Sequence, residues 1–461
     1  MIKFLNLFKI FKSEENSVYI KWLLRLAPPI ILAELISASV NILDTLMIGN
    51  RMGEAEITAV ALSHQIFFVY VVVFWGIASG CGVFIGQYFG TIKENEEDAL
   101  KNIRKTVGLG LSIAMLICIL FFIPSFFIPD VLIGIFSQDE NVIYLGANFL
   151  QILSFSYFPS AIIFTRNACM RNVGQTKVPM ITTSTALITN FILNFLVLFV
   201  FHLPLYTIAI GTVIARTIEM VLQQILIKNR NIPIRGTIKE YLGYDFKYIK
   251  EFFKVSSFLF LSMTVWSIGT SIYNIAFAYA GTYAQASIKM ASALMQFFSV
   301  FGFSLSVASG IIMSNTLGEG KIDLAIKYSR KSLFASVVIS SSMALLMIAF
   351  RGVLISFFNP EGEAARYLGN LIYIYAAGVI LRSVNFSNIA GTIRSGGDTK
   401  FNFWLDLIAV WAIGIPIAFF TARFLGLPIY WVVLFVHMDE VYKLIVSTHR
   451  VLSNKWAKKF V

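Results

Sequence analysis

Charged residues are scarce in this chain. They make up 13% of its 461 residues, whereas a soluble globular domain averages about 25%. So few charged side chains cannot cover a water-exposed globule of this size, so most of the surface must face lipid. The chain also has only three cysteines, which lie in or beside apolar stretches without the spacing of metal ligands. This pattern indicates neither a disulfide framework nor a zinc site.

Motifs of ATP hydrolysis and of common hydrolases are also missing. The sequence contains no GxxxxGK[ST] loop, no HExxH and no GxSxG, and its four histidines are scattered. We therefore expect no use of ATP by this chain, no enzymatic activity, no cofactor and no bound metal beyond a coupling Na⁺.

Long apolar stretches are abundant instead. Hydrophobic residues make up 57% of the chain, and about 20 predominantly apolar residues are enough for a helix to cross a bilayer. The first stretch is too long for a signal peptide and contains two acids, so we expect it to be retained. We predict twelve transmembrane helices, at 23–49, 57–86, 106–128, 142–165, 179–201, 205–227, 255–280, 284–313, 332–350, 367–391, 403–424 and 427–449.

Basic residues are distributed unevenly between the loops. Most of the 37 Lys and Arg residues fall at the N-terminus, in the loops on the same side and in the tail that begins at Lys443. This asymmetry predicts a multi-pass protein of the cell (inner) membrane with both termini in the cytoplasm. It also explains the net charge of +12 without a nucleic-acid partner. The opposite side has Arg51, Arg351, Arg366 and Arg423.

The two halves of the chain share sequence. Residues 171–177 (RNVGQTK) correspond to 394–400 (RSGGDTK), each after the fourth predicted helix of its half. The Tyr-Leu-Gly triplets at 144–146 and 367–369 are separated by the same number of residues, and Gly53/Gly281 and Gly90/Gly318 also correspond. We infer a duplicated six-helix unit. Because six is even, the copies have the same orientation, so the predicted fold is an all-α integral membrane protein of twelve helices, arranged as two parallel six-helix repeats around a central cavity.

This organisation predicts five segments. They are a cytoplasmic N-terminal segment (1–22), an N-lobe with helices one to six (23–230), a cytoplasmic inter-lobe linker (231–254), a C-lobe with helices seven to twelve (255–450) and a basic cytoplasmic tail (451–461). The start of the first segment either lies along the membrane surface or forms a frayed end.

Several short motifs occur in a characteristic order. They are Pro28-Pro29 and Asp44-Thr45 in the first helix, GQYFG at 86–90, Arg171-x-x-Gly174-x-Thr176, Asn190 and Asn194 in the fifth helix, and RSGGDT at 394–399. With these motifs the sequence resembles the multidrug and toxic compound extrusion (MATE) family over essentially its whole length. The resemblance implies a secondary active exporter of organic, mostly cationic and amphipathic compounds. It also implies antiport against H⁺ or Na⁺ by alternating access.

Four polar residues of the N-lobe are the candidate coupling site. Asn190 and Asn194 share one helix face, and Asp44, Asn194 and Thr212 are expected at similar depth. A carboxylate with amide and hydroxyl oxygens suits a monovalent cation, and the carboxylate alone suits a proton. The resemblance implies the same set as an N-lobe cation site, with Asp44 as the ionisable member. The alternative is that these groups only hold helices together.

The C-lobe differs from the sodium-coupled branch of that family, which has acids in the seventh and tenth helices. Any cation site here must be built differently or be absent. Instead Asp439 and Glu440 lie in the last predicted helix, Arg382 in the tenth and Lys289 in the eighth. These charges either form static buried ion pairs or hold the lobe closed until a proton or a cationic drug intervenes.

Three further features concern the helix interiors. Glu34 is a candidate cavity-lining residue. Pro28 and Pro29 remove backbone hydrogen bonds and should bend the first helix; the resemblance ties such a bend to protonation of the nearby acid, and a fixed kink is the alternative. Arg216 and Glu219, at i,i+3, are predicted to form a local structural pair.

Two other functions are alternatives to multidrug export. A flippase for lipid-linked precursors, a function of related folds, would favour a cavity with many basic groups, and only Arg216, Lys289 and Arg382 lie at depth. The second alternative is a membrane-embedded enzyme, but the sequence lacks the HExxH and GxSxG motifs that such an enzyme could use. The expected partners are the lipid bilayer and small-molecule substrates. The oligomeric state stays open, and a monomer is compatible with everything above.

Overall fold

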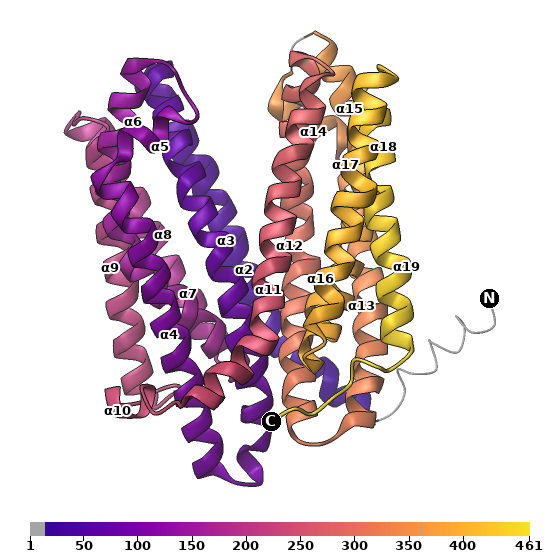
Figure 1. Ribbon diagram of the computed structural model, residues 1–461. Coiled ribbons are helices and arrows are strands. Elements are labelled where there is room, and N and C mark those ends of the chain that lie inside the picture. The colour runs from indigo at the N-terminus through magenta and orange to yellow at the C-terminus, as the bar shows by residue number, and fades with distance from the viewer. Residues whose placement is uncertain (1–13, 361) are drawn as a thin grey trace. The chain divides into compact units, whose positions relative to one another are not determined.

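The computed structural model describes residues 14–360 and 362–461, with only the backbone described at 14–17, 40–46, 49, 50 and 282. All regular structure in this described part is helical, in agreement with the predicted class (Figure 1). The predicted surface segment at the start of the chain lies outside the described residues.

The first six predicted membrane helices form in order. They are α2 (Glu14–Arg51), α3 (Glu54–Gly90), α4 (Glu96–Phe127), α6 (Glu140–Leu153) continued through η3 (Ser154–Ser156) into α7 (Tyr157–Asn172), α8 (Lys177–Phe195) continued by η4 (Leu196–Val200), and α9 (Tyr206–Asn229). Two short helices, α5 (Pro129–Gly134) and α10 (Ile238–Tyr241), and a single turn, η2 (Thr91–Lys93), lie between or after them.

The second six follow the same plan. They are α11 (Phe246–Ala278), α12 (Thr282–Gly318), α13 (Ile322–Ala349), α15 (Glu363–Phe386) continued by η5 (Ser387–Ile393) and η6 (Arg394–Gly396), α16 (Thr399–Leu407) continued through η7 (Ile408–Gly414), α17 (Ile415–Phe419) and η8 (Phe420–Phe424), and finally α18 (Ile429–Val436) with α19 (Met438–Leu452). The short helix α14 (Arg351–Phe358) precedes α15.

The last membrane helix is interrupted. Eleven helices in the described part of the chain are long and apolar enough to cross a membrane. The twelfth crossing is made by α18 and α19, which meet at His437, and three ionisable residues, Asp439, Glu440 and Lys443, follow that break. These charges lower its hydropathy without preventing helix formation, and the predicted count of twelve is confirmed.

The helix boundaries confirm the duplication. Helices α3 and α12 each contain 37 residues and end at the paired glycines Gly90 and Gly318. The loops after the fourth helix of each half also match: Gly174 and Gly397 have φ values of 77° and 75°. Glycine adopts this left-handed conformation without the steric cost that a Cβ brings.

The described chain divides into two compact units. The N-terminal unit contains Leu32–Ser256, and the C-terminal unit contains Ser257–Val461 together with the described residues up to Ile31. This division differs from the predicted lobes at the start of the first helix. Tyr19 and its neighbours in α2 pack against α12, and the Tyr19 hydroxyl lies 3.0 Å from Ser309 Oγ.

The predicted linker is folded into the N-terminal unit. Its helix α10 begins with a capping box at Thr237 and packs on α4, where Arg104 pairs with Glu240 at 2.5 Å. Gly108 permits this contact, because a Cβ there would lie 1.9 Å from the Tyr241 carbonyl oxygen. The next membrane helix, α11, already begins at Phe246.

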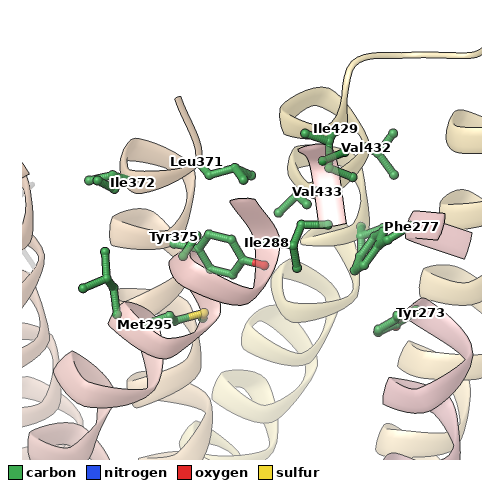
Figure 2. Packing of buried hydrophobic residues seen from close by; sticks show 14 of the residues in the cluster. Tyr273, Phe277, Ile288, Met295, Leu371, Ile372, Tyr375, Ile429, Val432 and Val433 are labelled. Carbon is green, nitrogen blue, oxygen red and sulfur yellow. The ribbon is translucent and has the colours of Figure 1, made fainter. Parts of the chain in front are cut away.

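The C-terminal unit is held together by a large apolar cluster from α11, α12, α15 and α18. Figure 2 shows part of it, with Tyr375 of α15 near Ile288 and Met295 of α12. The core positions of α12 recur at helical spacing, so one stripe of this helix is committed to the cluster. These positions are Ala284, Ile288, Ala291 and Met295.

Candidate coupling sites in the two units

Three of the four predicted coupling residues meet in the N-terminal unit. Asn190 of α8 donates through Nδ2 to Thr212 Oγ1 of α9 at 3.2 Å, and its Oδ1 accepts a hydrogen bond from Asn194 Nδ2 at 3.2 Å. Asn194 is 3% exposed. The side chains predicted to share a site therefore form one hydrogen-bonded chain between two helices.

A glycine allows the two helices to come this close. A Cβ on Gly211 would lie 3.2 Å from Asn194 Oδ1 and 3.4 Å from the Leu193 Cβ. Just beyond Asn194, α8 passes into the π-helical turn η4, and such turns are frequent at functional sites. The close approach of the two helices thus brings side-chain amide and hydroxyl groups together at one point of their interface.

The fourth residue, Asp44, lies in α2, but its side chain is outside the described part of the chain. Met47 and Ile48, which follow it, are buried in a cluster with Leu198 of η4 and Ile208 of α9. The Ile208 carbonyl accepts a hydrogen bond from Thr212 at 3.3 Å. The turn of α2 after Asp44 therefore packs beside the Asn190–Thr212 contact.

A second group of polar side chains lies farther along the same α8–α9 interface. Glu219 is completely buried, pairs with Arg216 at 2.8 Å and accepts a hydrogen bond from Thr183 Oγ1 at 2.6 Å. The predicted Arg216–Glu219 contact is therefore present. Gln223, which no sequence pattern indicated, donates through Nε2 to Asn167 Oδ1 at 2.9 Å. Thr212, Arg216, Glu219 and Gln223 share one face of α9.

Glu34 and the two prolines, also predicted to be functional, lie in α2. Glu34 forms an ion pair with Arg171 at 3.4 Å, and both side chains are partly exposed. Pro28 and Pro29 lie inside the continuous helix α2, just before the boundary between the two compact units. A role for Glu34 in lining a cavity stays a prediction.

The C-terminal unit contains a buried array of charges centred on α19. Glu440 accepts a hydrogen bond from Asn385 Nδ2 at 2.7 Å and lies 3.5 Å from Arg382 Nε and 3.8 Å from Lys443 Nζ. Lys443 is also 3.7 Å from Asp406 of α16. The predicted contact between Glu440 and Arg382 is thus part of a larger network.

Asp439 has a different environment. It accepts a hydrogen bond from the Tyr273 hydroxyl at 2.8 Å, and among the described residues no Lys or Arg nitrogen lies within 4 Å of it. Asp406 also accepts a hydrogen bond from Ser262. The array holds three acids and two bases, and Asp439 is the acid without a close cation.

Irregular backbone surrounds this array. The π-helical turn η5 begins just after Asn385, the π-helical turn η7 follows Asp406, and the break at His437 precedes Asp439. Gly414, the last residue of η7, is needed for the Tyr273 contact, because a Cβ there would lie 1.8 Å from the Tyr273 hydroxyl oxygen. The absence of a Cβ at Gly414, together with the irregular backbone, allows the Tyr273 hydroxyl to reach Asp439.

Two basic residues differ from their expected places. The distribution of positive charges places Lys443 with the cytoplasmic lysines, but it is 4% exposed and belongs to the charged array. Hydropathy cannot separate a buried, paired lysine from a loop lysine near a helix end. Lys289 does not join Asp439 and Glu440; it lines a separate cavity of about 570 Å³ between α11 and α12.

Asp406 was also not among the predicted residues, although the internal repeat contains a signal for it. Lys177 and Lys400 begin the equivalent segments after the fourth helix of each half. In that register Thr183 of α8 corresponds to Asp406 of α16. Thr183 contacts Glu219 of the sixth helix, and Asp406 contacts Lys443 of the twelfth.

Comparison with known proteins agrees with this architecture. The MatE family model matches residues 29–196 and 259–420, one match in each half and together well over half of the chain. The uncharacterized transporter YisQ of Bacillus subtilis is 26% identical over 90% of both chains. The probable multidrug resistance protein YoeA of the same organism is 24% identical over 87% of this chain and 86% of its own.

Solved structures show the same fold. An outward-facing multidrug resistance MATE family transporter of the MOP superfamily matches with a TM-score of 0.85 and 13% identity, covering 97% of this chain and 98% of the other. A mutant of the Vibrio cholerae MATE transporter VcmN matches with a TM-score of 0.85 and 17% identity, covering 96% and 100%.

Proposed function

Because the chain belongs to the MatE family, and is therefore a membrane transporter rather than an enzyme, we propose that it is a secondary active multidrug exporter. It exchanges amphipathic organic compounds for H⁺ or Na⁺ by alternating access, without ATP. The names of relatives such as YoeA support multidrug resistance as the role. Both termini are proposed to face the cytoplasm, and the protein to reside in the cell membrane.

The coupling ion binds in the N-terminal unit, at Asp44 together with Asn190, Asn194 and Thr212. The observation that carries this proposal is the hydrogen-bonded chain from Asn194 through Asn190 to Thr212. Asp44 precedes Met47 by three positions in α2, and Met47 is buried beside this interface.

Such a site can respond to either ion. Carboxylate, amide and hydroxyl oxygens are hard ligands, which suit a hard cation such as Na⁺. Without Na⁺, an acid at depth gains from protonation, because burial of an unpaired charge is costly. Neutralising Asp44 changes what α2 can pack against, and Pro28 and Pro29 give that helix a place to bend.

In the C-terminal unit, Glu440 acts as a structural ion-pair partner and Asp439 as the ionisable group. Glu440 has two cations and an amide donor close by, so its charge is well compensated. Among the described residues, Asp439 has the neutral Tyr273 hydroxyl as its hydrogen-bond partner and no Lys or Arg nitrogen within 4 Å. Gain or loss of a proton at Asp439 therefore changes the net charge of the array, while the Glu440 pairs stay intact.

Flippase activity toward lipid-linked precursors is less well supported. Such a cargo would require free basic groups for its phosphates. Arg216 is engaged by Glu219 and Arg382 by Glu440, which leaves Lys289 as the remaining intramembrane base proposed from the sequence.

Dye efflux from proteoliposomes tests the proposal, with Na⁺ and pH gradients imposed separately. We expect one gradient to drive efflux in the wild type, and Asp44→Asn to abolish driven efflux at normal expression. The matched control is Asp130→Asn, which changes an exposed acid in α5. Dye movement that depends on neither gradient would refute antiport. Efflux by Asp44→Asn at the wild-type rate would show that Asp44 is not part of the coupling site.

A further inference from the structure

A polar stripe runs along α12 beside its core stripe. The core stripe passes through Ile288 and Met295 (Figure 2). Shifting each core position by one residue rotates about 100° around the helix. The shifted positions carry polar side chains that line the cavity between α11 and α12. They are Gln285, Lys289, Ser292 and Gln296.

This stripe belongs to a membrane-crossing helix. The apolar span covers Tyr283–Gly318, and Lys289 lies about two turns inside α12, roughly 10 Å from its start. A lysine at this depth can extend its amine toward the interface. Gln296, almost two turns deeper, has no such reach, and a row of polar groups against lipid would be costly. The stripe must therefore face an aqueous or ligand-filled space.

The cavity has the size and chemistry of a ligand site. Its volume of about 570 Å³ lies within the range of roughly 300–1,000 Å³ typical of small-molecule pockets. Asn274 of α11 adds another amide, and Phe277 and Ile288 add apolar surface. None of the lining residues is acidic, and among the described residues no carboxylate oxygen lies within 4 Å of Lys289. The side chain of Lys289 is exposed.

We infer that this cavity binds the anionic group of an amphipathic substrate, with Lys289 as its charge partner. The inference rests on the proposed export function and narrows its substrate class to compounds that carry a carboxylate, including zwitterions. A purely cationic compound meets a like charge here. A carboxylate meets one ammonium and several amide donors, while its apolar body contacts Phe277 and Ile288.

A matched pair of dyes tests this inference in proteoliposomes of phosphatidylcholine. One dye is a rhodamine with a free carboxylate, and the other is its methyl ester, which keeps the cationic ring system. We expect the wild type to export the free acid with a KM at least about tenfold lower than that of the ester, as a charge-assisted contact predicts. Lys289→Gln should remove this preference while export of the ester continues, and Lys289→Arg should keep it.

The outcomes separate the two proposals. If neither dye is exported under either ion gradient, the export function itself fails. If both dyes are exported but the wild type shows no preference, or Lys289→Gln keeps the preference, only the present inference is overturned. Loss of the preference when phosphatidylglycerol replaces part of the phosphatidylcholine would show that a lipid headgroup occupies the site, which also overturns the assignment to substrate.

Discussion

Lys443 provides the sharpest test of the charged array. It lies 3.7 Å from Asp406 and 3.8 Å from Glu440, with 4% of its surface exposed. Replacing it with Gln keeps a hydrogen-bonding side chain of similar length but removes the charge. Arg382 is then the cation that remains within 4 Å of the array's acids among the described residues.

The expected loss of stability is large. At an effective dielectric constant of about 20, two charges at such a separation attract each other by about 4 kcal/mol. Removing one partner of a buried pair costs about 3–5 kcal/mol, because the remaining charge is left uncompensated. Lys443→Gln leaves Asp406 without a Lys or Arg nitrogen within 4 Å among the described residues, whereas Glu440 keeps Arg382. Adding Asp406→Asn removes that uncompensated carboxylate. The double variant should therefore recover at least about 1 kcal/mol relative to the single one.

Thermal stability is measured in detergent. Samples are heated, and the protein that remains folded is quantified by fluorescence-detected gel filtration. Because membrane proteins commonly unfold irreversibly, the ranking of midpoints is the relevant quantity. We expect wild type above the double variant, and the double variant above Lys443→Gln. Lys455→Gln, at an exposed lysine of the same unit, serves as the control. A Lys443→Gln midpoint equal to the wild-type one, or strictly additive effects, would refute the reasoning.

Three further predictions concern Asp439, Gly414 and Gly174. Asp439→Asn should lower driven efflux with little change of the melting midpoint, whereas Glu440→Gln should lower both; equal effects in both assays would contradict their separate roles. Gly414→Ala and Tyr273→Phe should both reduce efflux, because each removes the hydrogen bond from Tyr273 to Asp439: the methyl group added by Gly414→Ala would occupy the position of the tyrosine hydroxyl. Normal efflux by both variants would show that this hydrogen bond is dispensable. Gly174→Ala should cost about 1–2 kcal/mol through its positive φ alone, since its surroundings are open, and Gly174→Asn should cost less in the same melting assay; equal losses would argue against a backbone cause.

The transmembrane helices were predictable because lipid imposes a simple requirement. Each crossing needs one long apolar helix, so hydropathy locates it. Helix ends were less predictable, since polar residues continue a helix once it has left the membrane. The third predicted helix began at 106, but α4 begins at Glu96, where Asn95 caps it by accepting a hydrogen bond from Asp98 N–H.

The contacts of Asn190 were largely predictable, and the contact between Asp406 and Lys443 was not. Asn190 and Asn194 are one helical turn apart, so local geometry alone places them together. Asp406 and Lys443 come from two helices whose mutual rotation depends on packing and on the extra residue in the π-helical turn η7. No local pattern encodes that rotation.

The duplication supplies part of what local patterns lack. In the N-terminal unit, polar contacts join the fifth and sixth helices of the repeat through Thr183 and Glu219. In the C-terminal unit, the equivalent helices are joined through Asp406 and Lys443. Thr183 and Asp406 occupy corresponding positions, so the repeat has kept the place of the contact while its chemistry changed from a hydroxyl–carboxylate pair to a carboxylate–ammonium pair. Polar contacts between helices of a duplicated membrane protein should accordingly be sought at repeat-equivalent positions, even where the residue types differ.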